Sequence, residues 1–121
     1  MSLKDTCESA WDICPATIAG GTNLTGTINL GGLRLFGIAV PATWTAASLT
    51  FQMSPDGGTS WYNLQDQTGT EISAAANPSC CLTFDPKIFA PLQYIKLRSG
   101  PSSSPVNQTA ASTLQLVLRS V

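Results

Sequence analysis

The stretch Leu49-Thr50-Phe51-Gln52-Met53-Ser54 places an apolar side chain at every second position. A period of two is typical of a β-strand that buries one face and exposes the other. The same alternation recurs in Leu114 to Arg119 and in Tyr94 to Arg98, and shorter versions surround Thr83 and Asn29. No window of the chain repeats its apolar residues with the spacing of a helix. The alternation therefore predicts an all-β fold.

Turn signals separate these runs at short intervals, because glycine, proline and asparagine supply the backbone angles and local hydrogen bonds that turns require. About seven or eight short strands between such turns predict an antiparallel β-sandwich, of jelly-roll or immunoglobulin-like topology. The run Leu33 to Val40 is apolar on both faces apart from Arg34 and Gly37, which predicts a central strand covered on both sides. The turn clusters are Gly20-Gly21, Gly31-Gly32, Asp56-Gly57-Gly58, Asn77-Pro78 and residues 99–105.

With 121 residues, the chain has the usual size of one domain. Charged residues make up 11% of it, against about 25% in an average protein. The formal net charge of −1 argues against a nucleic-acid partner, because phosphate binding requires a basic surface. No apolar run approaches the roughly 20 residues that cross a bilayer, and the N-terminus lacks the apolar segment of a signal peptide. We expect a domain made inside a cell, with no membrane partner, whose weakly charged surface is partly covered by another protein.

The beginning of the chain differs from the rest. Its first 12 residues are rich in charge, whereas residues 13–55 contain only Arg34. We therefore expect residues 1–16 to form an extended N-terminal arm outside the sandwich, and residues 17–121 to form the β-sandwich domain. The charged residues at the start of the arm are Lys4, Asp5, Glu8 and Asp12.

The stretch Ser54-Pro55-Asp56-Gly57-Gly58-Thr59-Ser60-Trp61 matches the pattern Ser-x-Asp-x-Gly-x-x-Trp, a β-hairpin motif known as the Asp-box. We expect Asp56 to accept hydrogen bonds from the backbone of the turn and Trp61 to pack back over it. A second interpretation assigns the aromatic side chains to a ligand. Trp61 and Tyr62, together with Trp44, would then line an exposed groove that stacks on sugar rings.

The sequence contains no constellation typical of an enzyme. Histidine, the usual general base and a common metal ligand, is absent. The acidic residues are scattered, and a glycine-rich phosphate loop is also absent. Asp56, Asp66 and Glu71 could approach one another, but their spacing matches no calcium-binding loop, so we interpret them as solvated turn acids. We therefore expect no catalytic site, no cofactor and no metal site.

The chain contains four cysteines: Cys7, Cys14, Cys80 and Cys81. Their spacing matches no zinc site. On a strand, Cys80 would share the core-facing side with Leu82, and Cys81 would face solvent or a neighbour. Two interpretations stay open: the cysteines are buried or idle thiols, or one of the adjacent pair forms a disulfide with the arm or with a neighbouring subunit.

The stretches LRLFGIAVPATWTAA (33–47), LTFQMSPDGG (49–58), YIKLRSG (94–100) and PVNQ (105–108) are followed by a leucine-rich segment that ends at Arg119. Together they resemble small virion proteins of tailed bacteriophages, the capsid decoration or cement proteins. The resemblance covers roughly residues 22–121 and leaves the cysteine-bearing arm outside it. It implies a β-sandwich on the outer capsid surface, a homotrimer that binds the major capsid protein and neighbouring copies, and no catalytic residues.

In such an assembly the arm is the expected contact. We expect Trp11 and Ile13 to anchor it, because aromatic anchors dominate such interfaces; alternatively, Trp11 packs on its own sandwich. A receptor- or carbohydrate-binding module of a tail fibre or baseplate is a second function class. It would use the groove of Trp44, Trp61 and Tyr62 instead.

Overall fold

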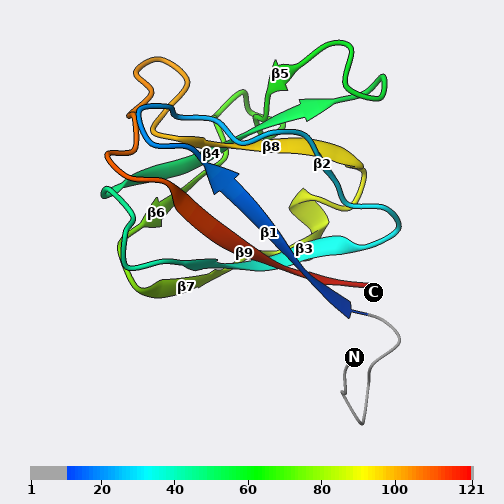
Figure 1. Cartoon of the computed structure of the whole chain (residues 1–121). Helices are drawn as coiled ribbons and strands as arrows, with labels where there is room; N and C mark the ends of the chain where they lie inside the picture. The colour runs from blue at the N-terminus through cyan, green and yellow to red at the C-terminus, as the bar shows by residue number, and fades with distance from the viewer. Residues whose placement is uncertain (1–10, 121) are drawn as a thin grey trace, which may run out of the picture.

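The computed structural model describes residues 11–120, and the fold is all-β, as the alternation predicts (Figure 1). A short 3-10 helix, η2, lies between the seventh and eighth strands. The elements are β1 (Trp11–Ile18), β2 (Ile28–Asn29), β3 (Arg34–Val40), β4 (Ala47–Ser54), β5 (Tyr62–Asn63), β6 (Ser73–Ala76), β7 (Cys80–Thr83), η2 (Pro86–Ile88), β8 (Tyr94–Ser99) and β9 (Ser112–Arg119).

Two antiparallel sheets pack face to face. Sheet A has the order β1-β9-β3-β7, and sheet B has the order β2-β8-β4-β5, with β6 also paired to β4. The pairs are nested: β1 lies beside β9, β2 beside β8, β3 beside β7, and β4 beside β5 and β6. A long hairpin that is rolled up in this way is a jelly roll. Of the two topologies left open by the sequence, the chain therefore adopts the jelly roll.

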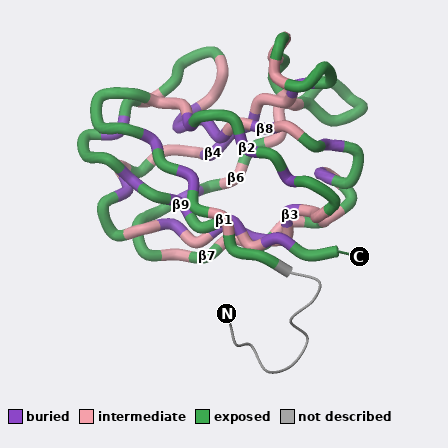
Figure 2. The backbone as a smooth tube through the Cα atoms, turned by 45° about the vertical axis from the view of Figure 1, so that its right-hand side comes forward, coloured by how far each residue is buried: buried purple, intermediate pink, exposed green. Residues whose placement is uncertain are grey.

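The core lies between the two sheets, where the alternating side chains meet. Leu114, Leu116 and Leu118 of β9 are buried opposite Ile95 and Leu97 of β8 in the other layer. In Figure 2 the buried segments follow the strands of both layers. Three phenylalanines fill one end of the core with ring centroids 5.1–5.9 Å apart in edge-to-face geometry. They are Phe51, Phe84 and Phe89.

β3 is central, as predicted, but it is not covered on both sides. It lies between β9 and β7, and its Leu35, Ile38 and Val40 are buried, whereas Phe36 and Ala39 are half-exposed. A bulge between Leu35 and Gly37 changes the register of the β3–β9 pair. A Cβ atom on Gly37 would lie 2.8 Å from the Leu82 carbonyl oxygen, so the close approach of β7 requires glycine there.

The predicted boundary at residue 16 is wrong. Residues 11–16 are not an arm outside the sandwich, because they form most of β1, which pairs with β9 along its whole length. Ala16 and Ile18 are in the core. Pro15 and Asp12 hide this strand in the sequence, since both residue types are rare in strands. The edge position explains why proline is tolerated, because one side of β1 pairs with no other described strand.

Candidate functional site: the outer face of sheet A

The side of sheet A that points away from the core is an almost uncharged surface. The strand registers align Ile13, Val117, Gly37 and Thr83 in one row across the four strands, and the next rows follow two residues along. We call these residues the outer face. It consists of Ile13, Pro15, Thr17, Gly37, Ala39, Cys81, Thr83, Thr113, Gln115 and Val117.

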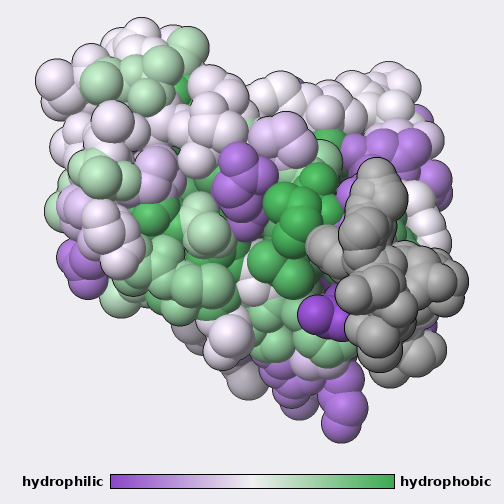
Figure 3. All heavy atoms as spheres, turned by 60° about the horizontal axis from the view of Figure 1, so that its bottom comes forward, coloured by the Kyte–Doolittle hydropathy of each residue, from purple (hydrophilic) through white to green (hydrophobic). Residues whose placement is uncertain are grey.

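The outer face measures about 14 by 14 Å, from the usual strand spacing and rise per residue. Ile13 is 42% exposed, and it is one of two large hydrophobic residues that are exposed in the described part of the chain. Figure 3 looks onto this side of the molecule and shows green and pale residues gathered over its middle, with a few purple side chains among them. Across β1 and β9, the hydroxyl groups of Thr17 and Thr113 share a hydrogen bond of 2.8 Å.

The free edge of β1 is poorly suited to pairing with another strand. Its Ile13 N–H donates to Asp12 Oδ1 over 2.8 Å, and Pro15 has no N–H to offer. Proline and charge on an edge strand are common protections against strand addition. The opposite edge of sheet A is β7, which is only four residues long. A partner would therefore meet the face of this sheet more readily than its edges.

The two predicted anchor residues both lie in β1. Trp11 is its first residue and pairs with Arg119 of β9, and its role as an anchor stays a prediction. Ile13 pairs with Val117, and its side chain stands on the outer face. The predicted contact residue Ile13 is thus presented by a rigid sheet instead of by a separate arm.

The orientation predicted for the adjacent cysteines is confirmed. Cys80 is half-buried against the core, and Cys81 is exposed on the outer face. Cys14, Cys80 and Cys81 are free thiols, and Cys7 lies outside the described residues. Cys14 and Cys80 stand on the opposite edge strands of sheet A, about 14 Å apart, which is beyond the roughly 7 Å between Cα atoms that a disulfide allows.

The surroundings of Cys14 make its thiol less reactive than that of a free cysteine. Burial raises the pKa of Cys14, and the negative charge of Asp12 raises it further. A thiol with a raised pKa carries little of the thiolate that reacts with disulfides or oxidants. A disulfide from Cys80 or Cys81 to the arm through Cys7, or to a neighbouring subunit, stays a prediction.

The predicted aromatic groove does not exist, because Trp44 is buried. Its side chain is only 3% exposed, and its Nε1–H donates to the Ala76 carbonyl oxygen over 3.2 Å. Tyr62 is exposed, and Trp61 is half-exposed. The Lys96 ammonium lies 4.4 Å from the centroid of the Trp61 ring, so a cation already occupies one face of this ring. The three aromatic side chains therefore do not form one sugar platform.

The Asp-box turn has the hydrogen bonds that its sequence predicts. Asp56 Oδ1 accepts from the Ser60 N–H and from the Ser54 hydroxyl, each over 2.8 Å. The indole Nε1–H of Trp61 donates to the Gly58 carbonyl oxygen over 3.1 Å, which closes the turn. Gly58 has a φ of 103°, an angle that other residues rarely adopt. The motif therefore stabilises its own turn.

The hydrogen bonds to Asp56 make the stability of this turn depend on pH. The bond from Ser60 N–H, then that from the Ser54 hydroxyl, hold the pKa of Asp56 below its usual value. A lowered folded-state pKa stabilises the fold above the unfolded pKa of about 3.9, and this contribution is lost as pH falls through the folded value. We expect Asp56→Asn to be less stable than wild type at pH 7, with a gap that closes in acid. Urea unfolding from about pH 7 to about pH 2 measures the gap, and a constant gap would contradict the assignment.

The other two acids of the predicted trio have separate roles. Asp66 Oδ1 accepts from the Thr68 hydroxyl and from the Thr70 N–H, and these bonds lower the pKa of Asp66. Asp56 and Asp66 are thus the turn acids that the sequence predicts. Glu71 is different, because it forms an ion pair with Arg98. Within residues 11–120, no three histidine, cysteine or acidic side chains lie close enough to hold a metal ion.

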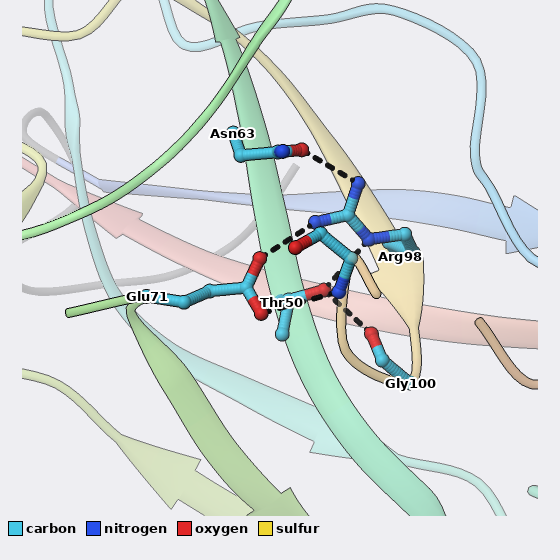
Figure 4. Close-up of polar contacts among 6 residues, drawn as sticks. Thr50, Asn63, Glu71, Arg98 and Gly100 are labelled. Carbon is cyan, nitrogen blue, oxygen red and sulfur yellow. Dashed lines mark hydrogen bonds and ion pairs between the residues drawn. The ribbon is translucent and has the colours of Figure 1, made fainter. Parts of the chain in front are cut away.

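Arg98 is a buried charge that the alternation pattern assigned to the solvent side of β8. Its Nε donates to Thr50 Oγ1 over 2.9 Å, and its two terminal nitrogens donate to Asn63 and Glu71 over 3.0 Å each (Figure 4). Thr50 in turn donates to the Gly100 carbonyl oxygen over 2.7 Å. These bonds fix β5, the segment before β6 and the loop after β8 onto sheet B.

Gln108 forms a second buried polar centre. Its side chain is fully buried, and its amide nitrogen donates to the Thr45 carbonyl oxygen over 3.0 Å and to Ser99 Oγ over 2.8 Å. Its amide oxygen accepts from the Thr45 N–H over 2.7 Å. Gln108 therefore joins the loop before β4 to the loop between β8 and β9. No sequence signal marks it, because it lies in a polar loop.

Both polar centres support loops, and neither contributes a residue to the outer face of sheet A. Within residues 11–120, no helix is long and apolar enough to cross a membrane. No family model, no curated protein and no solved structure matches the chain.

Proposed function

We propose that this chain is a structural, non-enzymatic protein of a virion, a capsid decoration protein that binds other proteins through the outer face of sheet A. The observation that carries this proposal is the uncharged outer face with Ile13 exposed on it. The virion context rests on the phage-like stretches within residues 22–121. The proposed partners are the major capsid protein and neighbouring copies in a homotrimer on the outer capsid surface.

The chemistry of the outer face suits the centre of a protein interface. Interface centres are depleted in charge, and polar residues surround them. Here the rows hold aliphatic, hydroxyl, amide and thiol side chains, none of them charged, and Arg34 and Arg119 lie at one end. A stable interface buries about 800 Å² on each partner, which is several times the outer face alone. Flanking segments, including the residues before β1, would supply the remaining contacts.

Repetition would make a modest contact effective. Each copy on a shell is bound next to many others, so weak contacts add up through avidity. A ligand that binds the assembled shell and not its separated subunits also stabilises the shell by mass action. The rigid sandwich fits this role, because few side chains of a preformed sheet lose freedom on binding.

A binding assay on particles tests the proposed function. The labelled chain is added to purified particles of the phage that encodes it, prepared without this protein, and bound copies are counted after sedimentation. We expect Ile13→Asp to reduce bound copies at least about tenfold, because it places an unpaired carboxylate in the interface. Gln115→Asp is also expected to reduce the number of bound copies, although the residue that it replaces is already polar.

The matched control is Gln67→Asp, which makes the same change of charge in an exposed turn between β5 and β6. It is expected to bind like wild type. Circular dichroism and the melting temperature show that each variant is folded. The proposed function fails if the wild-type chain does not bind the particles, or if all three variants bind equally well.

A further inference from the structure

Three cations gather at one end of sheet A. Arg119 ends β9, Arg34 begins β3 directly opposite it in the register, and Lys87 lies in η2 beside β3. Arg34 and Lys87 line an open pocket of about 220 Å³, together with Pro86 and Ala90. We call Arg34, Lys87 and Arg119 the basic corner.

The positive charge of the basic corner is poorly compensated by the described residues. The other two described cations have partners: Arg98 pairs with Glu71, and Lys96 lies over Trp61. Arg34, Lys87 and Arg119 form no ion pair within residues 11–120. Like charges that stand directly opposite on adjacent strands repel each other. Two described acids lie nearby. Asp85 precedes Lys87 by two residues, and its carboxylate accepts a hydrogen bond from the Lys87 backbone N–H over 3.0 Å. Asp12 follows Trp11, and its carboxylate accepts from the Ile13 backbone N–H over 2.8 Å.

The segment before β1 has the opposite net charge, and it joins β1 next to the basic corner. Residues 1–10 contain Asp5, Glu8 and Lys4, so their side chains carry a net negative charge. Trp11 pairs with Arg119, which places the start of β1 in the same row as the basic corner. In Figure 1 the start of β1 lies beside the C-terminal end of β9.

The length of this segment matches the distance that it has to cross. Two strand spacings, from β1 over β9 to β3, amount to about 10 Å. Glu8 precedes Trp11 by three residues and can extend about 10 Å from it. Asp5 precedes Trp11 by six residues and can extend about 20 Å from it, which also brings the pocket beside Lys87 within reach. Both carboxylates can therefore reach the basic corner of their own chain.

We propose that residues 1–10 dock on the basic corner of their own chain, with Glu8 and Asp5 against Arg119, Arg34 and Lys87. A direct tether gives the segment an effective concentration of the order of millimolar at its own corner, well above that of a second copy in dilute solution. Exposed ion pairs are individually weak and are screened by salt. The docked segment is therefore held reversibly and is released at high ionic strength, independently of any capsid.

Nitrogen-15 relaxation of the isolated, full-length chain tests this docking. At low salt we expect backbone order parameters above about 0.6 for residues 5–8, and at about 1 M NaCl values typical of free chain ends. Arg119→Glu is expected to lower these order parameters at low salt. Combining Arg119→Glu with Glu8→Arg, which restores opposite charges, is expected to raise them again. Lys96→Glu on sheet B is the control with the same change of charge, and it should have no effect.

Three outcomes would overturn the docking. Low order parameters at every salt concentration would show that the segment is not held. Order that is insensitive to Arg119→Glu would show that it is held elsewhere. Order that grows with protein concentration, together with a larger sedimentation coefficient, would assign the basic corner to the segment of a second copy.

Discussion

Replacing Arg98 by methionine is expected to lower the free energy of unfolding by about 3–5 kcal/mol, because it leaves buried polar groups without their partner. The Arg98 side chain is 6% exposed, and Glu71 is 21% exposed, so water can replace only part of the lost ion pair. Thr50 and Asn63 would each lose a hydrogen bond as well. Domains of this size are stable by only about 5–15 kcal/mol, so such a loss is a large fraction of the total.

Urea unfolding followed by tryptophan fluorescence measures the effect of Arg98→Met. The double variant Arg98→Met, Glu71→Gln should recover part of the lost stability. Without the guanidinium group of Arg98, a half-buried neutral amide at position 71 is less unfavourable than an unpaired carboxylate. Lys96→Met, on the same strand but with its ammonium over Trp61, is the matched control and should cost less than about 1 kcal/mol. A loss of less than about 1 kcal/mol for Arg98→Met would mean that the guanidinium group has no stabilising role.

The fold class could be predicted because alternation depends on sequence alone. In β9, Leu114, Leu116 and Leu118 are buried, and Thr113 and Gln115 are exposed, as a period of two requires. The choice between jelly roll and immunoglobulin-like topology could not be predicted. It depends on which strands pair, and the partner of each strand is set by packing between distant segments.

The errors about Arg98 and Trp44 have one physical origin, because distant parts of the chain decide whether these side chains are exposed. Arg98 looks solvent-facing in its own strand, but the β5–β6 segment covers it. Trp44 looks available in a polar loop, but its ring is buried and hydrogen-bonded to Ala76. The reverse holds for Ile13, which is apolar and yet exposed on the outer face.

The candidate site could be predicted only in part. Ile13 is predicted as an anchor residue of the arm, and Cys81 is predicted correctly on the outer side of β7. The outer face as a whole could not be predicted, because it combines residues from β1, β3, β7 and β9 that only the sheet registers bring together. The turn chemistry of the Asp-box was predictable, because the hydrogen-bond partners lie within four residues of each other.

Replacing Gln108 by leucine is expected to lower the free energy of unfolding by about 2–4 kcal/mol, because several buried polar groups lose their only side-chain partner. The Thr45 N–H and carbonyl oxygen and the Ser99 hydroxyl all bond to this amide. Leucine has a similar size, so the loss should come from unpaired polar groups and not from a cavity. Because both loops depend on Gln108, the Thr45 amide should also exchange its hydrogen faster than in wild type.

Gln115→Leu is the matched control, since it makes the same chemical change at an exposed position of β9 and should alter stability by less than about 0.5 kcal/mol. Urea unfolding compares the two variants, and hydrogen exchange followed by NMR reports on the Thr45 amide. If both variants lost the same stability, the buried amide would not be what joins the loops. If only Gln108→Leu is destabilised, one buried polar side chain fixes two loops that are remote in sequence.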